Sequence, residues 1–439
     1  MGTHCLLEEQ GDPLKAGSYK QRLFHNHAQA PGFRLTIGVI LLLLISLLLY
    51  RLSWGDGSTL DTRLRPYVQK GGIVVAEGDR LLFSHRGHEP FCPASTLKLA
   101  TALMALYELG ESYHFKTEFY LNKEKDLIIR GYGDPFLISE EWEIIVKRLR
   151  EMGKLPSELR GLLLDPTSFS PNLRIPGIGN SLNPYDARNG ALAANFNTAH
   201  VKVEGKGEIL PAEPQTPLTP LVRRLARGLP AGRHRINMSR DTTTALSYVG
   251  ELAQAFLIKG GYSFTGRAGV GRVEPNDRLI YSHRNMRSIS DVIASMMLYS
   301  SNFIANQILL MAGLEKRGEP ATLENGLACL RDFLSNQLAI ATSEFLVVEG
   351  SGISRQNRIT PRALIALLRA FYPYRHLLPK EKMTGARVKT GTLRGIYSLG
   401  GILEGEHPIF FVIILNQKKN YRDKVLSLLH AEFMAGVTK

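Results

Sequence analysis

The segment FCPASTLKLATALMALYELG, residues 91–110, combines a strongly apolar helical pattern with two polar residues near its start. Pro93 and Gly110 are typical of residues that flank the two ends of a helix. Apolar side chains line most of its circumference, which predicts a helix buried in a core. Ser95 and Lys98 stand three residues apart, so they share one face of that helix, with Cβ atoms roughly 5–6 Å apart.

This serine–lysine pair has the residue types of a nucleophile and its base. Burial lowers the pKa of a lysine, because desolvation disfavours the charged form. A neutral amine beside a serine at a helix N-terminus can accept the hydroxyl proton, and the helix dipole favours the alkoxide that results. The same spacing also arises when a serine caps a helix and a lysine extends its amine to solvent. The pair therefore predicts catalysis only if partner residues occur elsewhere in the chain.

The composition of the chain sets broad limits on its class. Its 439 residues suggest two or three domains, and 44% hydrophobic with 21% charged residues is typical of a globular protein. The net charge of +14 suggests an anionic partner, and nucleic acid, anionic lipid or an acidic cell-wall polymer would each fit. Cys5, Cys92 and Cys329 show neither metal-ligand spacing nor a disulfide framework. We expect no metal and no cofactor.

An uncharged apolar segment, LTIGVILLLLISLLLY, occupies residues 35–50 between Arg34 and Arg51. It is slightly short for a membrane span of about 17–25 residues, but the flanking arginines can reach the interface. We expect residues 35–52 to be an uncleaved transmembrane anchor after a leader of residues 1–34; a cleaved signal peptide is the alternative. Basic residues lie on both sides of the segment, so they do not set its orientation.

The remainder of the chain has strand patterns at both ends and helical patterns between them. Residues 73–76 and 80–84 are predicted to form a β-hairpin, and residues 386–417 a meander of three strands. One helix is predicted over residues 288–314, opened by the capping pair Ser288 and Asp291.

The middle of the chain has a different character. From about residue 114 to 241, short strand-like runs alternate with clusters of Gly, Pro and Asn. The predicted fold class is therefore α+β, with one αβ domain made of residues 58–113 and 242–439. Its antiparallel sheet and helices are interrupted by a mostly β insert over residues 114–241 and preceded by one N-terminal transmembrane helix.

Two further motifs complete the opening pair. YSSN, residues 299–302, supplies Ser300 and Asn302, and VKTGT, residues 388–392, supplies Lys389, Thr390, Gly391 and Thr392. Each motif alone could arise by chance in a chain of this length. Together, in this order, they match the S-x-x-K, S-x-N and K-T-G set of penicillin-binding proteins and serine β-lactamases.

The resemblance extends beyond these motifs. The wide gap between Ser95 and Ser300 is similar to that of peptidase family S13, the penicillin-binding protein 4 type of low-molecular-mass class C D-alanyl-D-alanine carboxypeptidases. Similarity covers roughly residues 60–435 and implies a serine β-lactamase/transpeptidase-like domain with a large insert. Two departures are Ser301 at the variable position of the S-x-N motif and Glu349 in place of the usual Asp of a D-G-S-G loop. Segments that resemble family landmarks are GYGDPFL (131–137), LLLDPTSF (162–169), NPYDARNGALAANFN (183–197), EPQTPLTPL (213–221) and EGSGISRQNRITP (349–361).

The resemblance implies a serine hydrolase that cleaves the D-Ala-D-Ala bond of peptidoglycan stem peptides. Ser95 would attack the carbonyl and form an acyl-enzyme, and Lys98 would be its base. Ser300 would pass a proton to the leaving amine, while Lys389 keeps the site positive. Asn302 would orient the substrate amide.

Further groups would bind the substrate. The backbone N–H groups of Ser95 and Thr392 would form an oxyanion hole. The hydroxyls of Thr390 and Thr392 would bind the terminal carboxylate, and Gly391 would let the strand approach the substrate closely. The resemblance implies β-lactam antibiotics as inhibitors. Because peptidoglycan stem peptides lie outside the cytoplasmic membrane, we expect the anchor in that membrane to hold the catalytic body in the periplasm.

Other functions are less well supported by the residues. A β-lactamase of class A would carry a glutamate where this chain reads LRDFLSNQL, and a class C enzyme would carry a tyrosine in place of Ser300. A non-catalytic penicillin sensor or wall-binding module is an alternative of another class, and carboxypeptidase and endopeptidase action both stay open. Arginines between residues 223 and 240 lack stacking aromatics, so we expect a solvated basic face and no nucleic acid.

Overall fold

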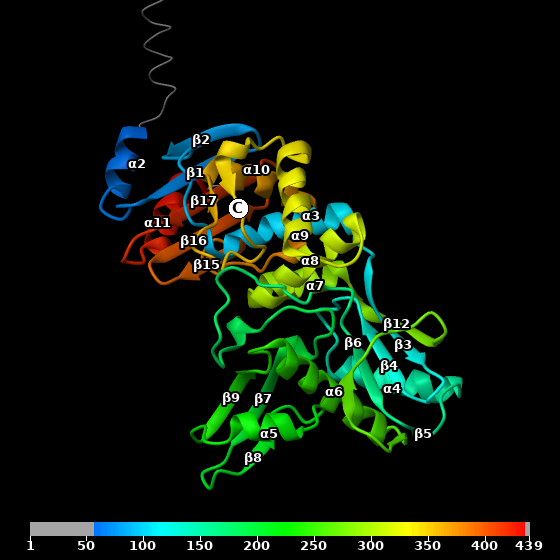
Figure 1. Cartoon of the computed structure of the whole chain (residues 1–439). Helices are drawn as coiled ribbons and strands as arrows, with labels where there is room; N and C mark the ends of the chain where they lie inside the picture. The colour runs from blue at the N-terminus through cyan, green and yellow to red at the C-terminus, as the bar shows by residue number, and fades with distance from the viewer. Residues whose placement is uncertain (1–56, 435–439) are drawn as a thin grey trace, which may run out of the picture. The chain divides into compact units, whose positions relative to one another are not determined.

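The computed structural model describes residues 57–434 (Figure 1). The predicted leader and the predicted anchor at residues 35–52 lie outside these residues. Within residues 57–434, no helix combines the length and the apolar character that a membrane crossing requires.

The two ends of the described chain meet in one antiparallel sheet with the strand order β15-β16-β17-β1-β2. All seven residues of β1 pair with β17, so N-terminal and C-terminal segments share the centre of the sheet. The predicted hairpin and meander are confirmed. The strands are β1 (Gly71–Glu77), β2 (Arg80–His85), β15 (Arg387–Leu393), β16 (Ile396–Leu403) and β17 (Ile409–Leu415).

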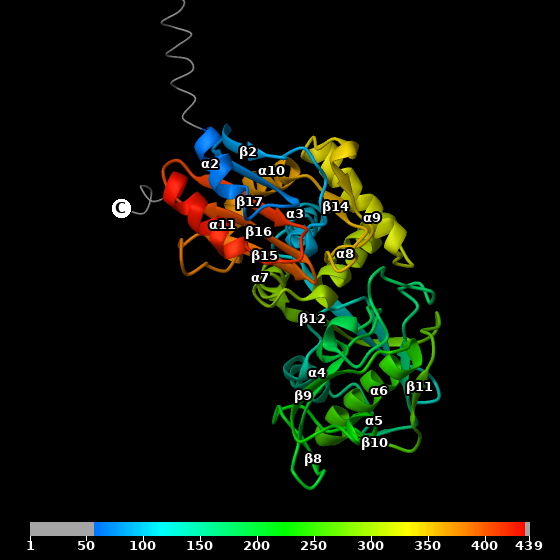
Figure 2. The same cartoon turned by 90° about the vertical axis from the view of Figure 1, so that its left-hand side faces the viewer.

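Helices cover both faces of this sheet (Figures 1 and 2). Side chains alternate between faces along a strand, which explains why neighbouring residues of β17 belong to different cores. Val412 and Ile414 pack with α3 (Lys98–Leu109), α8 (Asn302–Arg317) and α10 (Pro361–Phe371). Phe411 and Ile413 pack with α2 (Gly57–Leu64) and α11 (Arg422–Leu429). Burial on both faces accounts for the unbroken apolar run of β17.

The single helix predicted over residues 288–314 is wrong, because the chain breaks it at the YSSN motif. α7 (Ile289–Tyr299) ends where Ser300 adopts a left-handed conformation with φ of 54°. Ser301 then caps α8, and its Oγ accepts a hydrogen bond from the N–H of Ile304 at 3.2 Å. Both helices bury apolar faces in the same core, so hydrophobic periodicity continues across the break and conceals it. The predicted capping pair at Ser288 and Asp291 is confirmed.

A second core forms around a mixed sheet with the strand order β11-β6-β4-β3-β12. β6 pairs in parallel with β4 and β11, and the remaining pairs are antiparallel. These strands are β3 (His114–Leu121), β4 (Leu127–Gly131), β6 (Leu162–Asp165), β11 (Ala268–Val270) and β12 (Arg278–Ser288). A small sheet and three helices complete this part: β7 (Thr198–Val203), β8 (Ile209–Pro211), β9 (Gly232–Asn237), α4 (Ser139–Met152), α5 (Pro220–Ala226) and α6 (Thr242–Lys259).

Two elements that follow residue 241, the predicted end of the insert, pack with the second core. Tyr248 of α6 and Ile280 of β12 are buried in the second core with Trp142, and β12 pairs along its length with β3. On this packing, α6 and β12 belong with the second core, whereas Phe115, Phe136 and Phe169 from the predicted insert are buried in the first core. An apolar helix pattern shows that α6 is buried but not which core receives it, so the sequence alone could not set this boundary.

Short elements complete the described chain. The pairs are β5 (Glu158–Leu159) with β10 (Ser263–Phe264), and β13 (Phe345–Leu346) with β14 (Arg358–Ile359). α9 (Leu323–Asp332) packs beside α8 in the first core.

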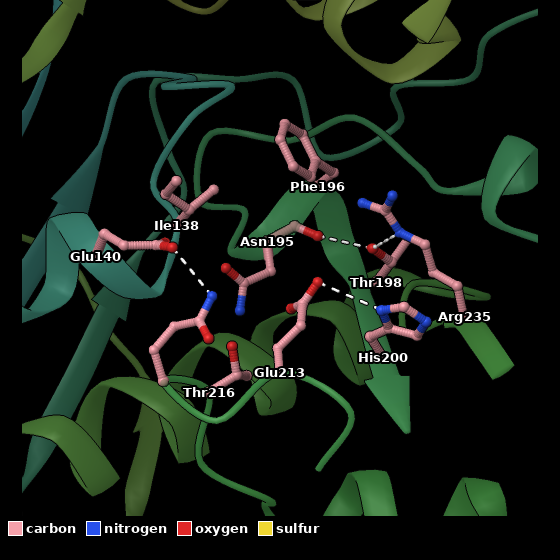
Figure 3. Close-up of a pocket in the computed structure, with 10 residues that line it drawn as sticks. Ile138, Glu140, Asn195, Phe196, Thr198, His200, Glu213, Thr216 and Arg235 are labelled. Carbon is pink, nitrogen blue, oxygen red and sulfur yellow. Dashed lines mark hydrogen bonds and ion pairs between the residues drawn. The ribbon is translucent and has the colours of Figure 1, made fainter. Parts of the chain in front are cut away.

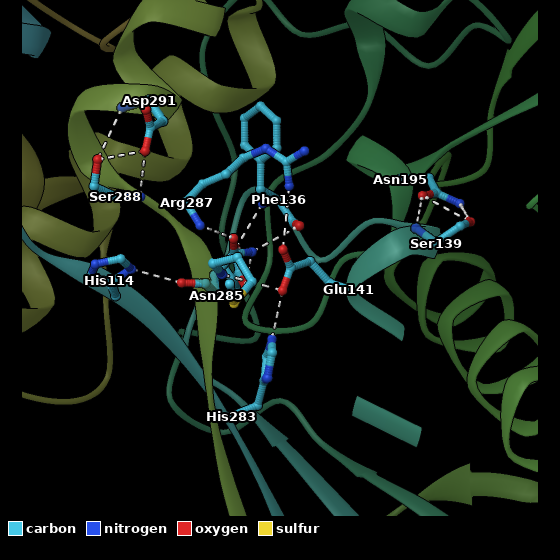
Figure 4. A network of polar contacts seen from close by, with 12 residues as sticks. His114, Phe136, Ser139, Glu141, Asn195, His283, Asn285, Arg287, Ser288 and Asp291 are labelled. Carbon is cyan, nitrogen blue, oxygen red and sulfur yellow. Dashed lines mark hydrogen bonds and ion pairs between the residues drawn. The ribbon is translucent and has the colours of Figure 1, made fainter. Parts of the chain in front are cut away.

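A buried polar network lies where β12 leads towards α7 (Figure 4). Glu141 of α4 accepts a hydrogen bond from Arg287 and contacts His283 Nε2 at 2.9 Å, with both Glu141 and His283 buried. Asn285 donates to both oxygens of the buried Asp134, at 3.2 and 2.9 Å. Burial raises the pKa of Asp134 to about 6. The network joins α4, β12 and the loop after β4.

A left-handed turn shapes a small polar pocket in the second core (Figure 3). Asn195, Phe196 and Asn197 all have positive φ, a conformation that residues other than glycine rarely adopt. The pocket encloses about 120 Å³. Its polar side chains already pair with one another: Arg235 donates to Thr198 Oγ1, and His200 contacts Glu213. The pocket is therefore a poor candidate for the catalytic site.

Candidate active site

Ser95 lies in a tight turn that precedes a buried helix. A 3₁₀ turn at Ala94–Leu97 leads directly into α3, so the predicted helix begins as two different helical forms. Ala94 has a φ of 47°, which is strained for a residue with a side chain. Gly352 lies against the Ala94 carbonyl, where a Cβ would collide with the backbone. The strained turn leaves Ser95 partly exposed while the residues around it are buried.

Lys98 is fully buried, with 0% of its surface exposed, and connects three parts of the chain. Its Nζ lies 3.0 Å from Ser95 Oγ, 2.8 Å from Asn302 Oδ1 and 2.7 Å from the carbonyl oxygen of Ser351. Burial, and then the charge of Lys389, hold the pKa of Lys98 well below its usual value, and the charge of Glu349 partly offsets them. A lysine with a lowered pKa beside a hydroxyl can act as a base.

A second lysine–serine pair stands opposite the first. Lys389 Nζ donates to Ser300 Oγ at 2.9 Å and to the carbonyl oxygen of Thr390 at 2.9 Å. Burial and the nearby charge of Arg422 lower the pKa of Lys389 to about 8. The left-handed backbone of Ser300 separates α7 from α8 at the point where this contact forms. Lys389 can therefore carry a positive charge at neutral pH next to a hydroxyl that can pass on a proton.

The edge strand β15 runs beside Ser95. A Cβ on Gly391 would come within 2.7 Å of the Ser95 backbone nitrogen and 2.9 Å of the Pro93 carbonyl oxygen, so only glycine fits there. Thr390 and Thr392 are exposed on the opposite face of the strand. Thr392 Oγ1 lies 3.5 Å from Arg422 NH1, which places a cation beside these hydroxyls.

A buried carboxylate for which no role was predicted, that of Glu349, holds the loop that contacts Lys98. Glu349 is 0% exposed and accepts hydrogen bonds from the backbone N–H groups of Ser351, Gly352 and Ser354 and from the side chains of Ser351, Asn306 and Asn357. These bonds fix the loop whose Ser351 carbonyl accepts from Lys98. Glu349 is therefore a positioning residue. Two signals were present in the sequence: an acidic residue inside VVEGSG, and Asn306 one helical turn after Asn302.

The part of the chain between β6 and β7 also reaches the site. Asn189 Nδ2 donates to the Phe303 carbonyl oxygen and to Gln307 Oε1, both at 2.8 Å, and Phe303 follows Asn302. Gly177 packs against the backbone of Ser354. No site residue was predicted in this region, because such contacts join segments more than a hundred residues apart.

The structure brings all eight predicted site residues into one region. Ser95, Lys98 and Asn302 join through the Lys98 amine, Ser300 joins Lys389, and Gly391 places the Thr390–Thr392 strand against Ser95. Two hydroxyls, each beside a buried amine of lowered pKa, suit proton transfer to and from a reacting group. Among residues 57–434, no cluster of His, Cys, Asp and Glu could hold a metal ion.

Comparison with known proteins identifies relatives of this chain. A family model described as the D-Ala-D-Ala carboxypeptidase 3 (S13) family matches residues 60–221 and 222–378. D-alanyl-D-alanine carboxypeptidase DacB of Haemophilus influenzae is 23% identical over 400 residues, covering 76% of this chain and 83% of the relative. D-alanyl-D-alanine carboxypeptidase of Actinomadura sp. (strain R39) is 25% identical over 420 residues, covering 79% and 77% of the two chains. The crystal structure of penicillin-binding protein 4 from Haemophilus influenzae has a similar fold, with a TM-score of 0.71 and 18% identity over 86% of this chain and 99% of that one.

Proposed function

The chain belongs to the D-Ala-D-Ala carboxypeptidase 3 (S13) family, and from this membership we propose the residues that carry out its reaction. It is a serine-type D-Ala-D-Ala carboxypeptidase that binds penicillin. Endopeptidase action on peptidoglycan stem peptides is also consistent with its relatives. The observation that carries the residue assignment is the Lys98 amine, which is buried and in contact with both the nucleophile and Asn302.

In the proposed acylation step, Ser95 Oγ attacks the carbonyl carbon of the penultimate D-Ala. The hydroxyl proton moves to Lys98 Nζ, which lies 3.0 Å away and whose pKa burial holds well below its usual value. The carbonyl oxygen becomes negative and accepts hydrogen bonds from the N–H groups of Ser95 and Thr392. Such preorganised donors are often the largest single contribution to catalysis.

Collapse of the tetrahedral intermediate breaks the bond to the terminal D-Ala. Ser300 donates its hydroxyl proton to the leaving amine and recovers a proton from Lys389, whose Nζ lies 2.9 Å from Ser300 Oγ. The charge on Lys389 and the Thr390 and Thr392 hydroxyls hold the substrate's terminal carboxylate. Lys98 then gives its proton to solvent and Lys389 regains one from solvent, which restores both amines. A water molecule attacks the ester, its proton moves to Lys98 Nζ, and that proton returns to Ser95 Oγ as the ester bond breaks and the product carboxylate leaves.

Labelled penicillin tests the nucleophile directly. Tandem mass spectrometry should locate a single adduct on Ser95, in the peptide that contains residues 93–98. Ser95→Ala should form no adduct, whereas Ser301→Ala, which alters a serine of the S-x-N motif outside the proposed proton path, should retain it. An adduct on another residue, or none at saturating drug, contradicts the mechanism. Release of D-Ala from a pentapeptide separates an enzyme from a non-catalytic penicillin sensor.

We also propose the cellular setting. Residues 35–52 anchor the protein in the cytoplasmic membrane, and the catalytic body faces the periplasm, where peptidoglycan stem peptides lie. The apolar run between Arg34 and Arg51 supports the anchor, and the substrate supports the orientation. A reporter that is active only outside the cytoplasm, fused after Lys439, should be active. Activity of a cytoplasm-only reporter at the same position contradicts this assignment.

A further inference from the structure

A cleft of about 620 Å³ lies apart from Ser95, Lys98 and Lys389, which do not line it. Its walls come from segments distant in the sequence: the end of β4, the loop after β6, residues 188–191, residues 272–274 after β11, and the turn at Glu319–Pro320 before α9. We call it the arginine cleft, because Arg130, Arg188 and Arg272 line it. Two carboxylates, Glu274 and Glu319, also line it, so positive charge is in excess.

The three arginines of this cleft differ in whether a carboxylate pairs with them. Arg130 is paired, since its NH2 lies 2.6 Å from Glu319 Oε2 and its Nε lies 4.0 Å from Asp165. Within residues 57–434, the side chains of Arg188 and Arg272 form no hydrogen bond and no ion pair. Hydrogen bonds from Thr244, with a smaller effect of Arg188, lower the pKa of Asp241, whose carboxylate caps α6 instead of pairing with Arg188. Two guanidinium groups therefore remain available to an anion.

Two polar atoms of residues that line the cleft add to this picture. In the described part of the chain, Arg188 Nε and Asn189 Oδ1 are both buried without a hydrogen-bond partner. Native structures leave few buried polar groups unpaired, and an unseen ligand is one physical reason for those that remain. One atom is a donor and the other is an acceptor, and the amide groups of a peptide offer partners of both kinds once the two side chains turn towards the cleft.

The size and lining of the cleft indicate an organic ligand. Phe169, Leu173 and Val273 supply apolar wall beside the arginines. A volume of about 620 Å³ falls within the range of about 300–1,000 Å³ that is typical of sites for organic ligands. An inorganic anion would use the guanidinium groups but would leave the apolar wall exposed. A short peptide with a carboxylate uses both, because guanidinium groups bind carboxylates through paired hydrogen bonds.

The arginine cleft is connected to the catalytic site through its wall. Asn189 donates to the Phe303 carbonyl oxygen, and Phe303 follows Asn302, the residue in contact with Lys98. Arg188 and Asn189 also line a neighbouring cavity of about 350 Å³, which extends along residues 173–179. Gly177 in that segment packs against Ser354 of the loop that Glu349 holds.

We propose that the arginine cleft is a second binding site of this protein, which takes a carboxylate-bearing peptide of the peptidoglycan substrate at Arg188 and Arg272. The proposal rests on the proposed function for the identity of the peptide, while the cleft itself stands on its own residues. Occupation of this site would retain a neighbouring stem peptide of the polymer near the enzyme without taking part in the chemistry at Ser95.

The test uses full-length protein whose Ser95 is blocked by penicillin. Isothermal titration with a disaccharide tetrapeptide should still show binding. Because penicillin occupies the catalytic site, this binding must lie elsewhere on the protein. Arg188→Gln and Arg272→Gln should each raise the Kd roughly tenfold, as expected for loss of a charge-assisted hydrogen bond. Arg224→Gln, which removes an exposed arginine of α5 outside the cleft, should leave the Kd unchanged. Both cleft variants should still react with penicillin at the wild-type rate.

Two further arms identify the ligand chemistry. A tetrapeptide with its terminal carboxylate converted to the amide should bind at least roughly tenfold more weakly. Inorganic phosphate at the same concentration should not displace the tetrapeptide. Absence of binding, equal binding by the Arg188 and Arg272 variants, or full displacement by phosphate overturns the proposal. If penicillin fails to label Ser95, the proposed function fails instead, and the titration with unlabelled Ser95→Ala protein still decides the cleft.

Discussion

At the scale of single residues, the site contains two buried lysines that each contact a serine hydroxyl but differ in their surroundings. Lys98 contacts Asn302 and a backbone carbonyl and lies near the charge of Glu349, whereas Lys389 contacts a carbonyl on an edge strand and lies near Arg422. Both pKa values fall on burial, and that of Lys389 falls to about 8. These different surroundings are consistent with the proposed roles of Lys98 as base and Lys389 as cation.

The rate of acylation by penicillin should consequently have a bell-shaped dependence on pH. On the acid side the rate falls as Lys98 gains a proton and ceases to be a base. On the alkaline side it falls above a pH of about 8, because Lys389 loses its charge there. Stopped-flow measurement of acylation against pH checks both limbs.

Variants of the two lysines show which lysine causes each limb of the pH profile. Lys98→Met should abolish acylation, whereas Lys389→Arg should retain part of it and lose the alkaline limb, since arginine stays charged. Near wild-type acylation by Lys98→Met together with an inactive Lys389→Met would show that the base is the other lysine.

Glu349 acts on the site through Lys98, and its charge can be tested separately from its shape. Glu349→Gln removes a negative charge that raises the pKa of Lys98, so the acid limb of the acylation profile should move to lower pH. The maximal rate should also fall, because an amide offers its N–H₂ group where Ser351 and Asn306 donate. Glu349→Asp keeps the charge and should keep the limb in place. An unshifted limb in Glu349→Gln would reduce Glu349 to a structural residue.

At the scale of elements, the site depends on three places where a regular element begins, breaks or meets another. The 3₁₀ turn before α3 exposes Ser95, the left-handed residue between α7 and α8 presents Ser300, and the glycine in β15 lets a strand touch a helix. None of these is a regular repeat. Hydrophobic periodicity therefore located the elements but did not reveal their ends.

The contact between β15 and the Ser95 turn should be intolerant of one added methyl group. Gly391→Ala places a Cβ against backbone atoms of Ser95 and Pro93, so β15 must shift away from the nucleophile. We expect acylation to slow by roughly a hundredfold, the size of effect that a 1 Å displacement can produce. Gly400→Ala is the matched control on the paired strand, because its Cβ would meet only leucine side-chain atoms at 3.4 Å or more. Acylation kinetics and circular dichroism of both variants decide the point.

At the scale of the whole molecule, the free energy of unfolding depends on pH through ionisable groups that are buried between the two cores. Asp134 is buried beside Asn285, and burial raises its pKa to about 6. A raised pKa means that the folded state binds the proton more tightly than the unfolded chain, so this residue's contribution to stability falls as pH rises through that range.

The variant Asp134→Asn isolates this effect, since asparagine does not titrate. Between about pH 4.5 and pH 7, the free energy of unfolding of the wild type should fall by roughly 2 kcal/mol relative to the variant. Urea unfolding at several pH values measures the difference. A constant difference across this range would contradict the raised pKa. A loss of packing or hydrogen bonding in the variant changes its free energy of unfolding equally at every pH, so it does not produce a pH-dependent difference.

By itself, the sequence indicated the candidate catalytic residues and determined much of the secondary structure. Ser95, Lys98, Ser300, Asn302 and Lys389 belong to short motifs, and the hairpin and meander follow from alternating apolar residues, both of which are local patterns. The antiparallel sheet of the first core and the α+β class could be predicted for the same reason.

Only the tertiary structure decided where those patterns stop and what they touch. The break at Ser300, the assignment of α6 and β12 to the second core, the role of Glu349 and the arginine cleft all depend on contacts between segments far apart in the chain. Helix periodicity shows that a face is buried but does not identify the partner that buries it. A hydrogen-bonded carboxylate or an unpaired arginine is likewise defined by its neighbours, and the fold alone supplies those neighbours.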